Sequence, residues 1–244
     1  MSSLIHALTI PWDFWLIFVL LGVLIPWRGA IRVRRLLRMP QVSPADRLAI
    51  YASTIAFQWV LAALVAWRCY ARAVNATDLG LIVRSPARTA LVAATLLLLF
   101  GVLQYAGIRR MSSHDATSYS HLRQISIRLM PRSSIELLAF VALATTASLC
   151  EEFLFRGFVF GILIRATASV ATAVIGSSFL FAVAHIYQGK RGLIITFVLG
   201  LLLAASRIWA GNLLPAIAGH LLVDLMAGYL APRYLNSPAA GKAK

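Results

Sequence analysis

Long apolar runs, several of them close to twenty residues, are the feature that most constrains how this chain can fold. A helix needs about 20 mainly apolar residues to cross the hydrocarbon core of a bilayer. Hydrophobic residues form 60% of the chain and charged residues 13%, whereas soluble domains average about 45–50% and about 25%. The sequence therefore predicts an all-α, polytopic transmembrane helical bundle of about seven spans. The expected spans are about Pro11 to Trp27, Leu48 to Trp67, Ala90 to Ile108, Leu137 to Ile164, Ala168 to Tyr187, Leu193 to Trp209 and Leu213 to Leu230.

Basic residues are concentrated in the segments between the apolar runs. The net charge of +15 is typical of the Lys and Arg that mark cytoplasmic loops, and we do not expect a nucleic-acid partner. The segment Arg28 to Arg47 is expected to be a basic loop. Its central part, Ile31 to Arg38, would either lie on anionic headgroups as a short amphipathic helix or be a solvated loop.

Very few ionisable residues remain inside the spans once loops and edges are set aside. They are Glu151, Glu152 and Arg156 in the fourth span, His185 in the fifth, and His220 and Asp224 in the seventh. Charged groups at bilayer depth are costly unless they are paired or face a wet cavity, so they are functional candidates by default.

Helical spacing predicts how these groups pair. Glu152 and Arg156 are four residues apart and can form an ion pair on one helix face. Glu151 is rotated by about 100° from Glu152, which leaves it available for another partner. His220 and Asp224 are also four residues apart, so Asp224 could bind beside His220 or orient it.

A carboxylate and two imidazoles from three helices would make a reasonable zinc site with an open position for water. Zinc lowers the pKa of bound water to about 7, and a carboxylate beside it can act as general base and then protonate a leaving amine. Three other interpretations stay open from spacing alone. The groups could form a proton relay in a transporter, a polar seam that joins helices, or a binding pocket without turnover.

Three motifs follow one another along the chain, each in its own apolar helix. They are Glu-Glu-x-x-x-Arg at 151–156, Phe-x-x-x-His from Phe181 to His185, and His-x-x-x-Asp from His220 to Asp224. Together they resemble the motifs of the CPBP family of intramembrane proteases, the relatives of type II CAAX prenyl endopeptidases. The stretch Asp78 to Leu81 resembles a weaker recurrent feature of that family.

The resemblance implies a role for each matching position. Glu151 would activate water, and Glu152 with Arg156 would support the site. His185 and His220 would coordinate metal or bind the water and the developing oxyanion. Asp224 stands where relatives carry Asn or Asp, as a ligand or a supporting residue. The expected metal ligands are thus His185, His220 and Glu151, with Asp224 as a further candidate, and the expected cofactor is zinc, with a metal-free glutamate mechanism as the alternative.

The sequence and the resemblance together predict an integral, multi-pass membrane endopeptidase, located in the bacterial cytoplasmic (inner) membrane. It would cleave a membrane-associated protein or peptide. The alternative is a non-catalytic immunity or partner-binding membrane protein or a proton-coupled transporter. We expect three regions. Residues 1–134 would hold about three spans and the basic loops, residues 135–232 a catalytic core of about four spans, and residues 233–244 a short basic tail.

Overall fold

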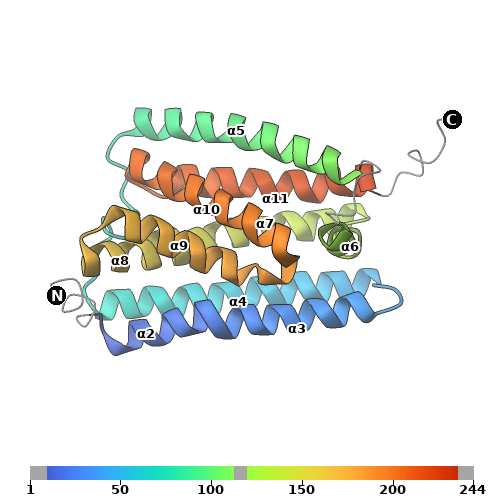
Figure 1. Ribbon diagram of the computed structural model, residues 1–244, viewed down its shortest axis with the longest axis horizontal. Coiled ribbons are helices and arrows are strands. Elements are labelled where there is room, and N and C mark those ends of the chain that lie inside the picture. The colour runs from blue at the N-terminus through green and yellow to red at the C-terminus, as the bar shows by residue number, and fades with distance from the viewer. Residues whose placement is uncertain (1–9, 113–119, 236–244) are drawn as a thin grey trace.

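The computed structural model describes residues 10–112 and 120–235, and within this part of the chain the regular elements are helices, with no strand. Figure 1 shows the longer helices running along the long axis, whereas α6 is seen nearly end-on. The elements are α2 (Trp12–Val19), η1 (Leu20–Leu24), α3 (Ile25–Arg38), α4 (Pro44–Ala71), α5 (Pro86–Ser112), α6 (Ser120–Leu129), α7 (Ser134–Glu152), η3 (Phe153–Val159), α8 (Phe160–Thr167), α9 (Val170–Ala184), η4 (Ile186–Gln188), α10 (Gly189–Ala210) and α11 (Leu214–Leu235).

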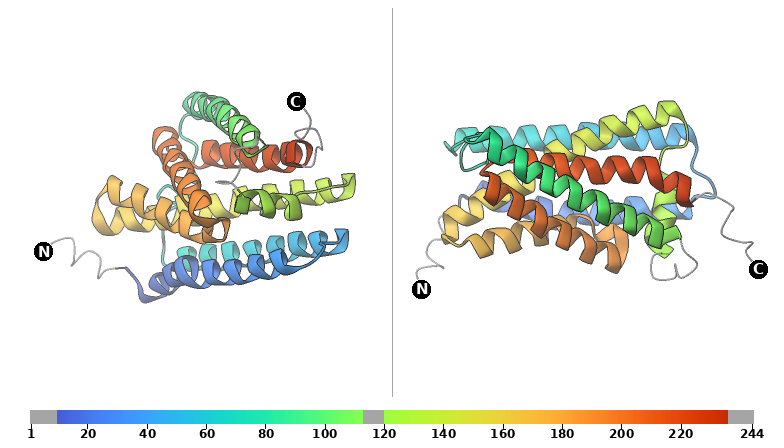
Figure 2. Two further views of the ribbon diagram at one scale, coloured as in Figure 1. Left: turned by 45° about the vertical axis from the view of Figure 1, so that its right-hand side comes forward. Right: turned by 90° about the horizontal axis from the view of Figure 1, so that it is seen from above.

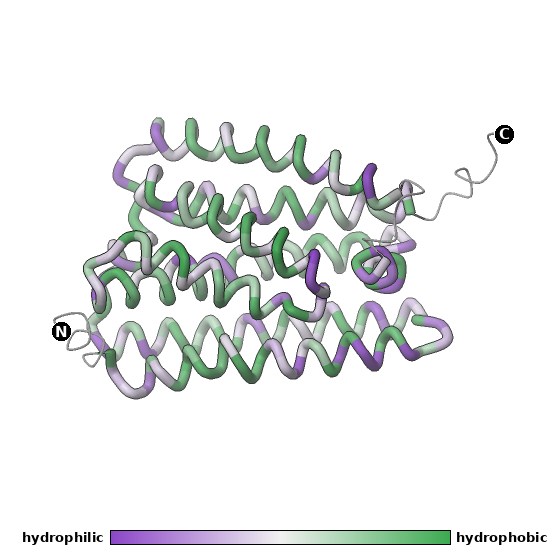
Figure 3. Tube along the Cα trace, viewed as in Figure 1, coloured by the Kyte–Doolittle hydropathy of each residue, from purple (hydrophilic) through white to green (hydrophobic). Residues whose placement is uncertain are grey.

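Six helical stretches in the described residues are long and apolar enough to cross a membrane, which makes the chain a multi-pass integral membrane protein. Figure 3 shows hydrophobic residues along most of their length. The expected fifth span is the exception, because its helix, α9, has 15 residues. At 1.5 Å per residue it measures about 22 Å, which is shorter than the ~30 Å hydrocarbon core.

The first span extends well beyond its predicted end. Elements α2, η1 and α3 form one continuous stretch of 27 residues, Trp12–Arg38. The loop expected from Arg28 is therefore wrong up to Arg38, and of the two alternatives for Ile31 to Arg38 the helix is present. Arginine is a good helix former, and no Gly-Pro pair interrupts this segment. Pro26 is tolerated because it lies at the start of α3, directly after the π-helical turn η1, where the hydrogen-bond ladder is already displaced.

The short connection to α4 is fixed by local capping. The Ser43 side chain accepts a hydrogen bond from the backbone of Asp46, whose carboxylate in turn accepts one from the Ser43 backbone, and Pro44 occupies the first turn. This reciprocal arrangement satisfies two amide groups that a helix start leaves unpaired. Arg47, expected in the loop, is therefore part of α4.

A 34-residue helical stretch, Ser134–Thr167, composed of α7, η3 and α8, holds the central position. It packs against α4, α9 and α11, and Figure 2 shows the neighbouring helices around it. One end is fixed by Arg47 of α4, whose guanidinium donates two hydrogen bonds of 2.8 and 2.9 Å to buried Glu136 of α7. The fold therefore brings α4, α9 and α11 against the stretch that carries Glu151, Glu152 and Arg156.

Candidate active site

The two adjacent glutamates lie where the central helix changes its winding. Glu151 and Glu152 are the last residues of α7, and the π-helix η3 begins at Phe153. A π-helical turn holds more residues than an α-helical turn, and such turns occur frequently at functional sites. Arg156 lies inside η3, and both Arg156 and Glu152 are fully buried.

Glu152 is held by two partners. Its Oε1 accepts a 2.7 Å hydrogen bond from Arg156 Nη1 and a 2.8 Å bond from His220 Nδ1 on α11. The ion pair that the i,i+4 spacing predicts is therefore present. Paired charges of this kind are tolerated in a low-dielectric interior, whereas removal of one partner leaves a costly unpaired charge.

Arg156 is itself enclosed by groups from α9 and α10. Its Nη2 donates to the Gly200 carbonyl at 3.3 Å, and its guanidinium carbon lies 4.1 Å from the centre of the Phe181 ring. A Cβ at position 200 would lie 3.2 Å from Arg156 Nη2 and 3.0 Å from Ser178 Cβ. Only a glycine leaves room for the α10 backbone to approach the guanidinium this closely.

Glu151 has different surroundings. Its Oε1 accepts a 2.6 Å hydrogen bond from Gln58 Nε2 of α4. Its Oε2 lies 3.6 Å from His185 Nε2 and is buried with no hydrogen-bond partner among the described residues. His185 Nδ1 donates to the Phe181 carbonyl at 2.9 Å, so Nε2 is the ring nitrogen that faces Glu151.

Phe181 holds the two imidazoles in one region. The centre of its ring lies 4.7 Å from that of His185 and 5.7 Å from that of His220. The Phe-x-x-x-His motif therefore places a packing residue and a functional candidate one helical turn apart, with the phenylalanine between the two histidines. This ring also covers Arg156, which links both glutamate environments.

The positions of the predicted site residues differ from expectation in one respect. His220 was expected opposite Glu151, but its Nδ1 is bound to Glu152, because α11 packs against α7 at the turn that presents Glu152. His220 Nε2 lies 3.8 Å from Asp224 Oδ2, a distance too long for a hydrogen bond. The six candidates thus form two linked groups: Glu151 with His185, and Arg156, Glu152, His220 and Asp224 in series.

The predicted metal ligands do not form a metal site in this arrangement. Among residues 10–112 and 120–235, no group of three or more His, Cys, Asp or Glu side chains is placed so that it could hold a metal ion. His185 Nε2 faces Glu151 and His220 Nε2 faces Asp224, so the donors are paired two by two. A zinc ion would require these two pairs to come together.

Sequence reasoning missed Gln58 as a residue of this site. A signal was present, because Gln58 is a lone amide inside the apolar second span. Polar side chains inside a span face protein or water rather than lipid. The partner could not be identified from the sequence, since Gln58 and Glu151 are 93 positions apart.

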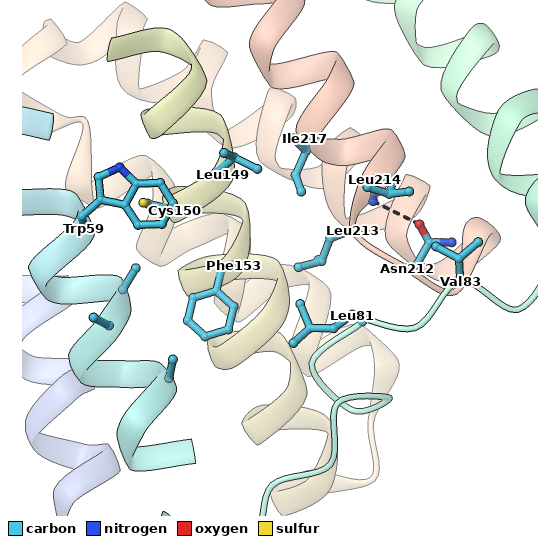
Figure 4. Close-up of a pocket in the computed structure, with 14 residues that line it drawn as sticks. Trp59, Leu81, Val83, Leu149, Cys150, Phe153, Asn212, Leu213, Leu214 and Ile217 are labelled. Carbon is cyan, nitrogen blue, oxygen red and sulfur yellow. Dashed lines mark hydrogen bonds between the residues drawn. The ribbon is translucent and has the colours of Figure 1, made fainter. Parts of the chain in front are cut away.

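A cavity of about 420 Å³ is lined by Cys150 and Phe153, the residues directly before and after the two glutamates in the sequence, and not by the glutamates themselves. Figure 4 shows Trp59 of α4, Cys150 and Phe153 of the central helix and Ile217 of α11 around it. Leu81 and Val83, from the connection between α4 and α5, contribute another wall. The lining is apolar almost throughout, so this space suits an apolar group.

Part of the chain is similar to a known protein family. Residues 133–226 match the family model described as type II CAAX prenyl endopeptidase Rce1-like. None of the curated proteins and none of the solved structures compared with the chain matches it. The matched region contains all six ionisable candidates, from Glu151 to Asp224. The match covers less than half of the chain, and this region is similar to type II CAAX prenyl endopeptidases.

Proposed function

We propose that this protein is an endopeptidase that hydrolyses a peptide bond of a membrane-associated protein or peptide, with Glu151 as the general base. The observation that carries the proposal is that Glu151 turns a free oxygen toward His185 and has no arginine partner among the described residues. Glu152, which also has a free Oε2, is instead paired with Arg156. Glu151 Oε2 is buried, has no hydrogen-bond partner among the described residues, and lies 3.6 Å from His185 Nε2. A general base must have such an oxygen within reach of water.

The hydrolysis uses these groups in sequence. Glu151 Oε2 accepts a proton from a water molecule while the water oxygen attacks the carbonyl carbon of the scissile bond. The resulting oxyanion collapses, the C–N bond breaks, and Glu151 transfers its proton to the leaving nitrogen. The products are a carboxylic acid and an amine, and the carboxylate of Glu151 is regenerated.

The histidines supply the polar contacts for water and oxyanion. Each has its Nδ1 engaged, His185 with the Phe181 carbonyl and His220 with Glu152, so Nε2 is the nitrogen left for the reacting groups. With Nδ1 donating, Nε2 of a neutral imidazole accepts a hydrogen bond from water, and it donates to the developing oxyanion only when the ring is protonated. Glu152 and Arg156 support this arrangement by fixing His220, and Asp224 is placed beside the same imidazole.

An apolar cavity next to the site supports the proposed substrate class. The apolar cavity lies directly beside Cys150 and Phe153, the residues that flank the two glutamates. It would receive an apolar part of a substrate that reaches the site from the bilayer. The bacterial cytoplasmic membrane is the location we propose for such an enzyme.

We propose zinc only for a metal-bound state in which the pair Glu151–His185 and the pair His220–Asp224 come together. His185, His220 and Glu151, with Asp224 as a further ligand, would hold it, and it would supply Lewis-acid activation of water. The described side chains do not form such a group, so no step above depends on a metal. Metal analysis of the purified protein, with and without chelator, tests this point.

The direct test is cleavage of quenched fluorescent peptides with apolar, membrane-anchored segments by the purified chain in detergent. Glu151→Ala and His220→Ala should abolish cleavage, whereas His121→Ala, at an exposed histidine of α6, should leave it unchanged. Equal activity in wild type, Glu151→Ala and His220→Ala would contradict the proposal. A pH-dependent flux across proteoliposomes that these two variants lose, without any peptide cleavage, would favour a proton-coupled transporter instead.

A further inference from the structure

Gln58 of α4 is a polar residue in an apolar span, outside the three motifs and outside the region that matches the family model. Its side chain is buried, with 8% of the residue exposed, whereas its neighbours Phe57 and Trp59 are about half exposed. The helix therefore turns this one amide inward, toward the central helix.

The contact that Gln58 makes is short and specific. Its Nε2 donates to Glu151 Oε1 at 2.6 Å. Since Oε1 is occupied in this way, Oε2 is the oxygen left over, and it is the oxygen that faces His185. A carboxylate with one oxygen fixed cannot rotate freely, so the second oxygen is held in one direction.

The other end of the amide argues against a purely structural role. Gln58 Oε1 is buried with no hydrogen-bond partner among the described residues. A glutamine that only joined two helices would be expected to have both ends paired, because buried unpaired groups are unfavourable. Here the end that faces Glu151 is satisfied and the opposite end is not.

The charge of the donor is also informative. Glu152 is bound by a guanidinium, which compensates its negative charge. Glu151 is bound by a neutral amide, which fixes the carboxylate without adding a positive charge. A neutral donor is what a carboxylate that must accept a proton requires.

We propose that Gln58 is the positioning residue of Glu151: it holds Oε1 so that Oε2 points toward His185 and the reacting water. This inference rests on the proposed peptidase function. It assigns to the first half of the chain a part of the site that lies outside the matched domain.

The test uses the full-length protein in detergent and a peptide that the wild type cleaves. Gln58→Leu removes the donor and should lower kcat by about 10- to 100-fold, because a misplacement of about 1 Å can cost about 100-fold. KM should stay within about threefold, since Gln58 does not line the apolar cavity proposed to receive the substrate. The matched control is Thr146→Val, which removes the hydrogen bond that Trp59 Nε1 donates to Thr146 between the same two helices and should leave kcat within about twofold.

Gln58→Glu adds a readout that a structural role would not move. When protonated, the carboxyl group introduced by Gln58→Glu can donate a hydrogen bond to Glu151, whereas the ionised carboxylate repels it. The pH of maximal activity should therefore be lower in Gln58→Glu than in wild type. If Gln58→Leu does not fold, Gln58→Glu and the shorter Gln58→Asn give the same comparison.

The outcomes separate the two proposals. If wild type cleaves, Glu151→Ala does not, and Gln58→Leu behaves like Thr146→Val, the positioning role is wrong and the peptidase function stands. An unshifted pH profile in Gln58→Glu would likewise overturn the positioning role. If the wild type cleaves none of the peptides, the proposed function fails, and the role of Gln58 fails with it.

Discussion

Glu151 and Glu152 are neighbours in the chain, yet their surroundings have little in common. Glu152 is fully buried, is paired with Arg156, and also accepts a hydrogen bond from His220. Glu151 is partly accessible, accepts one hydrogen bond from the neutral Gln58, and has a free oxygen near His185. Each carboxylate has an Oε2 without a hydrogen-bond partner among the described residues, so the two differ in the charge of their partners and in their burial.

Two adjacent glutamates of one motif thus have different partners. A helix rotates by about 100° per residue, so adjacent side chains meet different neighbouring helices. Glu152 meets α11 and the guanidinium of its own helix, whereas Glu151 meets α4 and the end of α9. We infer that Glu152 stabilises the site and that Glu151 is the residue free to exchange protons.

The largest effect on stability is expected from Glu152→Ala. It leaves Arg156 fully buried without its counter-ion and should lower the free energy of unfolding by about 3–5 kcal/mol. Unfolding of the purified protein in detergent, followed by intrinsic fluorescence against denaturant or temperature, measures this.

Glu136→Ala is the matched control, because Glu136 forms a buried pair with Arg47 at the end of the bundle. It should cost a similar amount of stability while its folded fraction keeps its cleavage rate. A Glu152→Ala protein as stable as wild type would show that the ion pair with Arg156 does not hold the site together.

A smaller effect is expected from Gly200→Ala. The added Cβ would meet Ser178 Cβ at 3.0 Å and Arg156 Nη2 at 3.2 Å, so the guanidinium must move. Overpacking of this kind costs about 1–3 kcal/mol, and cleavage should fall because Glu152 and His220 move with Arg156.

Gly107→Ala in α5 is the control for this substitution, since a Cβ there meets nothing within 4 Å. Alanine favours a helix over glycine by up to about 1 kcal/mol, so this variant should be as stable as wild type or slightly more stable. Equal behaviour of the two alanine variants would contradict the packing assigned to Gly200.

The smallest effect is expected from Asp224→Asn. The Asp224 side chain is about one third exposed and lies 3.8 Å from His220 Nε2, and accessible pairs are worth about 0–1 kcal/mol. The rate of peptide cleavage should therefore change by no more than about fivefold. A 100-fold loss in Asp224→Asn, with the folded state intact, would show that the charge of Asp224 takes part in the reaction.

Much of the fold could be predicted from the sequence because the thickness of the bilayer sets the length of the apolar helices that cross it. The all-α bundle and the pairing of Glu152 with Arg156 follow from composition and helical spacing, and both are present. The loop expected from Arg28 to Arg47 is confined to residues 39–43, because arginines mark the membrane surface and do not end a helix. The α3 helix continues to Arg38.

The long-range contacts of the site could not be predicted from spacing. His220 and Glu152 are 68 positions apart and meet because α11 packs against α7. Gln58 meets Glu151 for the same kind of reason, through the packing of α4 on α7. The π-helix after Glu152 also has no clear sequence signal, and it sets the turn on which Arg156 lies.

The difference between the two glutamates is tested most directly by kcat for peptide cleavage in Glu151→Gln and Glu152→Gln, each normalised to its folded fraction. Both substitutions keep the size of the side chain and remove its charge. Glu151→Gln should remain as stable as wild type to within about 1 kcal/mol and lose about 10²- to 10⁴-fold in kcat, the range typical of a lost general base. A folded, active Glu151→Gln beside a folded, inactive Glu152→Gln would contradict the account and assign the reactive role to Glu152.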